Sequence, residues 1–129
     1  MSGPLIFIAT NKLKPGAFDA ERQRIPDLAK FLRASEPRLI AFNEYVNDDR
    51  SEVSVAQIHP DAASMEAHIE IVKDRAAQAY TETLDQTVRI QIFGTPSSNV
   101  LAALRLHAGT GVRLYIHATH IGGFTRIQP

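Results

Sequence analysis

The feature that most constrains this chain is the order in which strand-like and helix-like patterns follow one another. Short runs of β-branched and aromatic residues are typical of strands, and apolar residues three and four apart are typical of helices. Over about residues 5–93 these patterns occur in the order strand, helix, strand, strand, helix, strand. This is the split βαβ order of ferredoxin-like folds, in which both helices cover one face of an antiparallel sheet. The sequence therefore predicts an α+β fold.

The predicted elements have recognisable boundaries. The four strands are expected at Leu5–Ala9, Arg38–Asn47, Glu52–His59 and Thr87–Phe93, and the two helices at 17–35 and about 61–84. Pro26 lies within the first helix, where a proline costs about 3 kcal/mol because it removes a hydrogen bond. We expect a kink or a restart there. Asp61 is expected to be the N-cap of the second helix.

A further helix and strand follow the ferredoxin-like core. Thr95 is expected to cap this helix, with Pro96 in its first turn, where the missing N–H costs nothing. A fifth strand is predicted over 112–119, and the tail over 122–127 is expected to be a short strand or an arm. We expect one domain, with a core over about 4–93 and an α-β extension over about 94–127.

Composition excludes several classes of function. Lysine plus arginine and aspartate plus glutamate number 14 each. The chain therefore lacks the basic field on which non-specific nucleic-acid binding depends. It contains no cysteine, which excludes disulfides and thiolate metal sites. The apolar run near the N-terminus is too short for a signal peptide or a membrane span, so we expect a cytoplasmic protein with no membrane partner.

The two middle strands carry apolar residues on both faces. Two helices cover only one face of a ferredoxin-like sheet, so an apolar second face needs another partner. A second copy of the same chain is the simplest candidate. The pattern therefore predicts a homodimer.

Several short segments resemble the antibiotic-biosynthesis-monooxygenase-like group of dimeric α/β barrels. Val55–Ile69 resembles the strand-to-helix passage of that family, including its alanine-histidine pair at Ala67 and His68. Pro15 and Gly16 match the turn after the first strand, and Glu36-Pro37 match the passage into the second strand. The resemblance covers roughly Leu5–Phe93 and implies a dimeric barrel of antiparallel sheets, with a cavity between each sheet and its helices.

Two departures limit what the resemblance implies about activity. His59 stands where the family carries a tryptophan, and the chain contains no tryptophan. The heme-degrading members of the family rely on that bulky residue, so heme degradation is not expected. The extension over 94–127 also exceeds the minimal family domain and could cover a cavity.

His59 and His68 are the candidate catalytic residues. His59 ends a predicted strand, and His68 lies on the core side of the helix that follows. The resemblance places this region at the cavity, where the two imidazoles could approach each other. Histidine can take a proton from a phenol or a quinol near neutral pH. The alternative is that each is a hydrogen-bonded structural histidine.

Three further residues are candidates for substrate binding. Gln57 shares a strand face with His59, and Asn43 and Tyr45 share a face of the neighbouring strand. An amide could steady a developing enolate or phenolate. Cross-strand packing is the alternative for Asn43 and Tyr45, and Glu44 is expected to be a solvated or edge charge.

Metal binding is not expected. His117 and His120 are three apart, and residues at that spacing on a strand point to opposite faces. His107 is expected at a helix end, where a cation suits the helix dipole. No sequence motif asks for a cofactor.

Two classes of function remain open. The first is an enzyme: a cofactor-independent monooxygenase or a related isomerase that acts on a small aromatic or quinol-like molecule. The second is a non-catalytic homodimer that binds a small hydrophobic ligand or has a structural role. A cavity of about 300 Å³ or more is a size that ligand sites commonly have.

Overall fold

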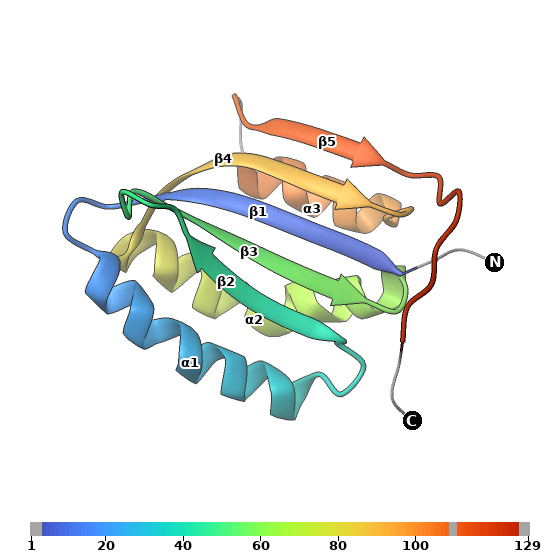
Figure 1. The fold of residues 1–129 in the computed structure, drawn as a ribbon, viewed down its shortest axis with the longest axis horizontal. Helices are drawn as coiled ribbons and strands as arrows, with labels where there is room; N and C mark the ends of the chain where they lie inside the picture. Colours follow the sequence, from blue (N-terminus) through green and yellow to red (C-terminus); the bar gives the residue numbers. More distant parts are fainter. Residues whose placement is uncertain (1–3, 109–110, 127–129) are drawn as a thin grey trace.

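The computed structural model describes residues 4–108 and 111–126, and its element order is the predicted one (Figure 1). The strands are β1 (Leu5–Leu13), β2 (Ala41–Val46), β3 (Glu52–His59), β4 (Leu84–Phe93) and β5 (Arg113–His117). The helices are α1 (Phe18–Ser35), α2 (Ala62–Glu82) and α3 (Ser98–Ala108).

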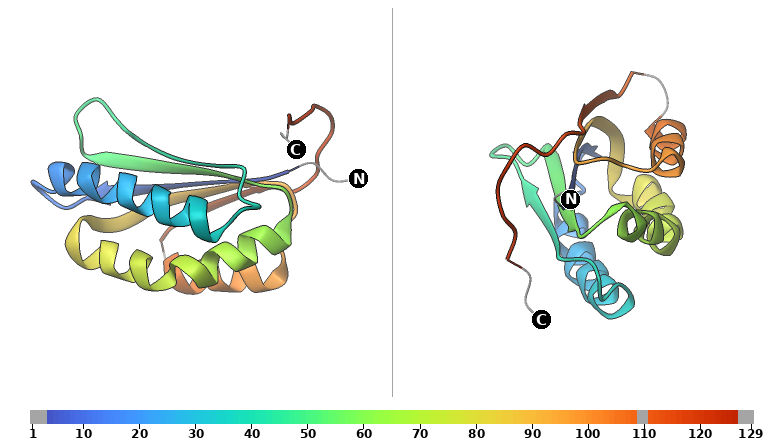
Figure 2. Two further views of the ribbon diagram at one scale, coloured as in Figure 1. Left: turned by 90° about the horizontal axis from the view of Figure 1, so that it is seen from below. Right: turned by 90° about the vertical axis from the view of Figure 1, so that its right-hand side faces the viewer.

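All five strands form one sheet, in the order β2-β3-β1-β4-β5. The first four pair antiparallel, and β5 runs parallel to β4. The three helices lie together on one face of this sheet (Figure 2). The predicted α+β ferredoxin-like arrangement is therefore confirmed, and the extension adds one helix and one strand to it.

Several element boundaries differ from those predicted. β1 extends to Leu13 because it is the central strand, and Leu13 still finds a partner in Leu84 at the start of β4. α1 runs through Pro26 as one continuous helix. Arg22, whose carbonyl loses its usual partner to the proline, is exposed, so water can satisfy that oxygen.

The N-cap of α2 was predicted correctly, and that of α3 was not. The Asp61 side chain accepts a hydrogen bond from the Ser64 N–H at 2.9 Å. In α3 the capping oxygen belongs to Ser97, which accepts from the Val100 N–H at 3.1 Å. Thr95 instead donates to the Ala118 carbonyl at 3.1 Å. The helix thus begins after Ser97, and the hydrogen bond from Thr95 connects the preceding loop to the end of β5.

The hydrophobic core lies between the sheet and the helices, and α3 is part of it. Its main cluster contains Leu5, Phe7, Ala9, Met65, Ile90, Ile92, Val100 and Leu104. Gly94 makes the passage from β4 to α3 with a φ of 111°, and a Cβ there would lie 3.1 Å from the Pro4 carbonyl oxygen. Only glycine suits that backbone and that close approach. No described helix is long and apolar enough to cross a membrane.

The opposite face of the sheet carries no helix (Figure 2). Ile6, Ile8, Ala56 and Ile58 form its half-buried apolar centre, as the strand register shows. Tyr45 and Tyr115 flank this centre and are 64% and 43% exposed. We call this surface the open face.

Candidate functional site

A cavity of about 490 Å³ lies between the helix-covered face of the sheet and α1 and α2. Apolar side chains make up most of its wall, among them Phe7, Phe42, Val55, Met65 and Ile69. Its polar lining includes Asn11, Arg24, Glu44, Gln57, His68, Tyr80 and Thr87. An apolar space with a few convergent polar groups is the usual form of a small-molecule site.

His59 is completely buried, and both of its ring nitrogens are used. Nδ1 lies 2.8 Å from Ser64 Oγ, and Nε2 lies 3.0 Å from Gln57 Oε1. Because an amide oxygen only accepts, Nε2 carries the proton and Nδ1 accepts from the serine hydroxyl. Burial, followed by the nearby His68, lowers the pKa of His59 to about 4. His59 is therefore a neutral imidazole held between two partners.

His68 lies next to His59, with 5.4 Å between the ring centroids. Its Nδ1 is 2.8 Å from Glu36 Oε2, and both side chains are buried. Nε2 has no hydrogen-bond partner among residues 4–108 and 111–126, and His68 lines the cavity. His68 thus presents a ring nitrogen to the cavity while Glu36 fixes the ring from behind.

The protonation of this pair follows from its burial. Burial raises the pKa of Glu36 to about 7 and lowers the pKa of His68 to about 4. Above pH 7 the Glu36 carboxylate accepts the Nδ1–H proton, which leaves the Nε2 lone pair free as a base. Below that pH a protonated Glu36 donates to Nδ1, so the ring proton sits on Nε2 and the base is lost.

Gln57 contacts His59, whereas Asn43 and Tyr45 lie away from both histidines. Since Gln57 Oε1 accepts from His59, its amide nitrogen is left for the cavity that Gln57 lines. Asn43 and Tyr45 are exposed on the open face, opposite the cavity. Their proposed contact with a ligand would require that ligand to lie on the other side of the sheet.

A second polar group lies farther along the cavity, around Asn11. Its Oδ1 accepts from Tyr80 Oη at 2.5 Å and from Thr87 Oγ1 at 2.8 Å, and these two hydroxyls are 2.7 Å apart. Asn11 is 5% exposed, and its amide nitrogen has no partner in the described part of the chain. The hydroxyls therefore orient an amide donor that lines the cavity.

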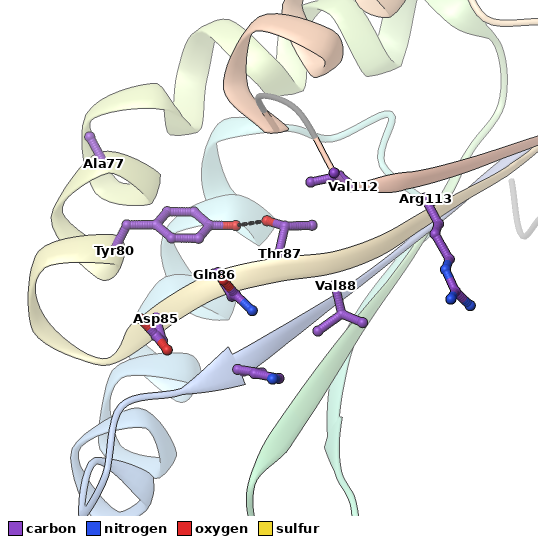
Figure 3. A pocket seen from close by; sticks show the side chains of 10 residues that line it. Ala77, Tyr80, Asp85, Gln86, Thr87, Val88, Val112 and Arg113 are labelled. Carbon is purple, nitrogen blue, oxygen red and sulfur yellow. Dashed lines mark hydrogen bonds between the residues drawn. The ribbon is translucent and has the colours of Figure 1, made fainter.

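Tyr80 and Thr87 line both this cavity and a wide depression beside the first half of β4 (Figure 3). The depression measures about 820 Å³ and is lined by Lys12, Asp85 and Arg113, among others. Charges of both signs surround it.

Glu44 does not have the solvated position expected from the sequence. It lines the cavity from β2 and hydrogen bonds to Glu21 of α1. Burial, and then Glu21, raise the pKa of Glu44 to about 9. Glu44 does lie on an edge strand, since β2 ends the sheet, but it is not solvated because α1 packs over this end of β2 and brings a second carboxyl group against it.

Sequence reasoning missed Glu36, Glu21 and Glu44 as site residues. In the sequence, Glu36 only matches the passage into the second strand, and 32 positions separate it from His68. The available signal was charge on the core side of predicted elements: Glu44 shares a strand face with Phe42.

Metal ligands do not cluster in the described residues. No group of three histidine, aspartate or glutamate side chains is placed to hold an ion there. The His117 ring stacks on Phe93, with 5.1 Å between the ring centroids. The side chain of His107 lies outside the described residues.

The fold is that of the antibiotic biosynthesis monooxygenases, as the resemblance predicted. A solved structure of an antibiotic biosynthesis monooxygenase superimposes with a TM-score of 0.58 at 20% identity, covering 68% of this chain and 94% of that one. Rv0793 from Mycobacterium tuberculosis gives a TM-score of 0.61 at 16% identity, covering 74% and 98%. No protein-family model matches the sequence, and a comparison with curated proteins finds no match.

A further structure resembles the whole chain. MupZ from Pseudomonas fluorescens gives a TM-score of 0.71 at 14% identity and covers 98% of this chain and 91% of its own. Coverage that high necessarily includes the α3-β5 extension. The extension is thus a shared architectural feature, while the low identity limits this likeness to the fold.

Proposed function

We propose that this chain is a cofactor-independent monooxygenase that acts on a small aromatic or quinol-like substrate. The observation that carries the proposal is His68, whose Nε2 faces an apolar cavity while Glu36 holds Nδ1 at 2.8 Å. A base fixed by a buried carboxylate is suited to take a proton from a phenolic hydroxyl. The shared fold with an antibiotic biosynthesis monooxygenase supports the same class of reaction.

The proposed reaction begins when His68 Nε2 removes a hydroxyl proton and Glu36 stabilises the imidazolium. The amide nitrogen of Gln57, which contacts the neighbouring His59, would donate to the substrate oxyanion. The electron-rich ring then reacts with O₂, which forms one carbon–oxygen bond. Quinol plus O₂ gives hydroxyquinone plus water, and the substrate supplies all four electrons.

His59 is better suited to positioning than to proton transfer. Both of its nitrogens are occupied, and among the described residues the cavity lining contains Gln57 and His68 but not His59. We therefore assign His59 the role of orienting the Gln57 amide and packing against the His68 ring.

Oxygen uptake with a panel of hydroquinones tests the proposal. Because general-base catalysis contributes about 10²–10⁴-fold, His68→Ala should lower kcat by at least 10²-fold. For the wild type, kcat/KM should rise as pH increases through about 7, where Glu36 ionises. Glu36→Gln should abolish this rise in kcat/KM, because an amide that donates to Nδ1 moves the ring proton of His68 to Nε2.

Asn43→Ala is the matched control because Asn43 lies on the open face, and its oxygen uptake should equal that of the wild type. Wild-type rates in His68→Ala would refute the assignment of the base.

The second candidate is a non-catalytic carrier of a small hydrophobic ligand. The predominantly apolar wall of the cavity favours it. Native mass spectrometry that shows a retained ligand, together with no oxygen uptake for any hydroquinone, would select this function over the enzyme.

We also propose a homodimer formed through the open face. Its centre is apolar and carries no helix, and solvent-exposed apolar surface of this kind is typical of an interface. A two-fold arrangement would place two sheets face to face and leave each cavity on the helix side.

A further inference from the structure

We propose that Glu44 is a second proton-transfer group of the same cavity, which donates to an oxygen of the substrate while His68 acts on another. The substrate class is then a small ring that carries a hydroxyl group and a carbonyl group conjugated with it, as in a hydroxyquinone. This inference rests on the proposed function, because it concerns the same cavity and the hydroxyquinone that the proposed reaction forms.

The geometry of Glu21 identifies which carboxyl group carries the proton. Glu21 is 1% exposed and accepts from Arg24 Nε at 2.8 Å and Nη2 at 2.7 Å, and from Thr83 Oγ1 at 2.6 Å. Although burial opposes it, the hydrogen bonds from Arg24, Glu44 and Thr83 lower the pKa of Glu21. Glu21 is therefore the carboxylate of the pair.

Two carboxyl groups hydrogen bond to each other only if one of them is protonated. Since Glu21 is ionised, the proton belongs to Glu44, which is the member of the pair that lines the cavity. Burial and Glu21 keep Glu44 in this form at neutral pH. A neutral carboxylic acid thus faces an apolar space, with a paired carboxylate and an arginine behind it.

A second observation indicates that this end of the cavity receives a ligand. The Asn11 amide nitrogen also belongs to a buried side chain that lines the cavity, and no described residue accepts from it. Every fully buried side-chain nitrogen and oxygen of the described residues has a partner, so this amide reaches the open space of the cavity, where water or a ligand can accept from it. A substrate oxygen would satisfy it.

The proposed step conserves charge across the cavity. At one end the substrate O–H bond breaks and its proton moves to His68 Nε2. At the other end the Glu44 O–H bond breaks and a new O–H bond forms on the substrate. The net result is a tautomerisation of a hydroxyquinone, in which the hydroxyl becomes a carbonyl and the conjugated carbonyl becomes a hydroxyl, and it needs no oxidant. Loss of the added proton from His68 to solvent and uptake of a proton by Glu44 reset the site. The step would act on the hydroxyquinone that the reaction with O₂ forms.

Other charged groups surround Glu44. Glu21 and Arg24 face it from α1, and Glu70, Lys73, Arg75 and Tyr80 line the same cavity from α2. A test must therefore separate the titration of Glu44 from theirs.

Binding of 1,4-naphthoquinone provides that test. This probe has two carbonyl oxygens and no ionisable group, and the chain has no cysteine with which it could form a thiol adduct. Isothermal titration calorimetry between pH 8 and 10.5, where Glu36 is already ionised, should give a nearly constant Kd close to pH 8. Above about pH 9 the Kd should increase by up to about tenfold per pH unit, because Glu44 loses the proton that it donates.

Glu44→Gln should bind with no such pH dependence, because an amide donates at every pH. The control Glu70→Gln, at another position in the lining, should retain the wild-type profile. If Glu44→Gln fails to fold, Glu21→Gln replaces it, and the weakening should begin at lower pH because the neighbouring carboxylate is gone.

A flat wild-type profile, or an unchanged profile in Glu44→Gln or Glu21→Gln, would overturn the inference. Its failure is distinguishable from failure of the proposed function. His68→Ala should keep the pH dependence of naphthoquinone binding while it loses oxygen uptake.

Discussion

At the scale of single residues, two neighbouring histidines differ in what their nitrogens contact. His59 uses both nitrogens on Ser64 and Gln57, and His68 uses one on Glu36. His59 therefore has the environment of a structural residue, and His68 has that of a base. The number of satisfied nitrogens, rather than burial, distinguishes them.

His59→Ala should lower the free energy of unfolding by about 3 kcal/mol at pH 7, because it leaves a void and two buried polar groups without partners. Urea denaturation measures this change. The folded-state pKa of about 4 lies below the usual 6.5, so the neutral ring stabilises the fold above pH 6.5, and this contribution is lost as pH falls toward 4. The difference between wild type and variant should therefore shrink over that range.

Gln23→Ala is the control for the same measurement and should change stability by less than about 0.5 kcal/mol, since Gln23 is exposed on α1, away from the open face. A difference between wild type and His59→Ala that grows as pH falls from 6.5 to 4 would contradict the neutral assignment of His59.

The part of the site that lies on a single strand could be predicted from the sequence, because the side chains of one strand alternate between its two faces. Gln57 and His59 share a face of β3, and the structure brings them together. The pairs Glu36–His68 and Glu21–Glu44 depend on how α1 packs across the sheet, and no periodicity encodes that packing. Asn43 and Tyr45 were placed on a common face correctly, but the pattern does not say which face carries the helices.

At the scale of elements, the element order was predictable and the boundaries were less so. Apolar spacing identified both helices of the core, and short runs of β-branched and aromatic residues identified the five strands. β1 and β4 proved longer because each pairs with neighbours along its length, and pairing partners are not visible in a local pattern. The cap of α3 was misplaced because Thr95 and Ser97 are both good capping residues.

Ser97→Ala should lower the free energy of unfolding by about 1 kcal/mol, because it removes the cap of α3. Thr95→Val is the matched variant and should cost less, since it removes only a bond to an exposed loop carbonyl. Thermal unfolding followed by circular dichroism compares the two. Equal or reversed costs would mean that Ser97 does not cap the helix.

At the scale of the whole molecule, the open face determines the proposed assembly. Ile8→Asp places a charge at its apolar centre and should convert the dimer to a monomer. Sedimentation equilibrium at micromolar concentration measures this, with Gln23→Glu on the exposed side of α1 as the control. A monomeric wild type would exclude the proposed dimer.

The contribution of α3 to the core has a consequence for how the chain is made. Val100 and Leu104 pack in the same cluster as Ile90 and Ile92. Protein synthesis proceeds from the N-terminus at about 5–20 residues per second, so the sheet's first four strands leave the ribosome seconds before α3 does. During that interval part of the core faces water. The nascent chain therefore passes through a stage at which a chaperone has apolar surface to bind, and the arrival of α3 ends it.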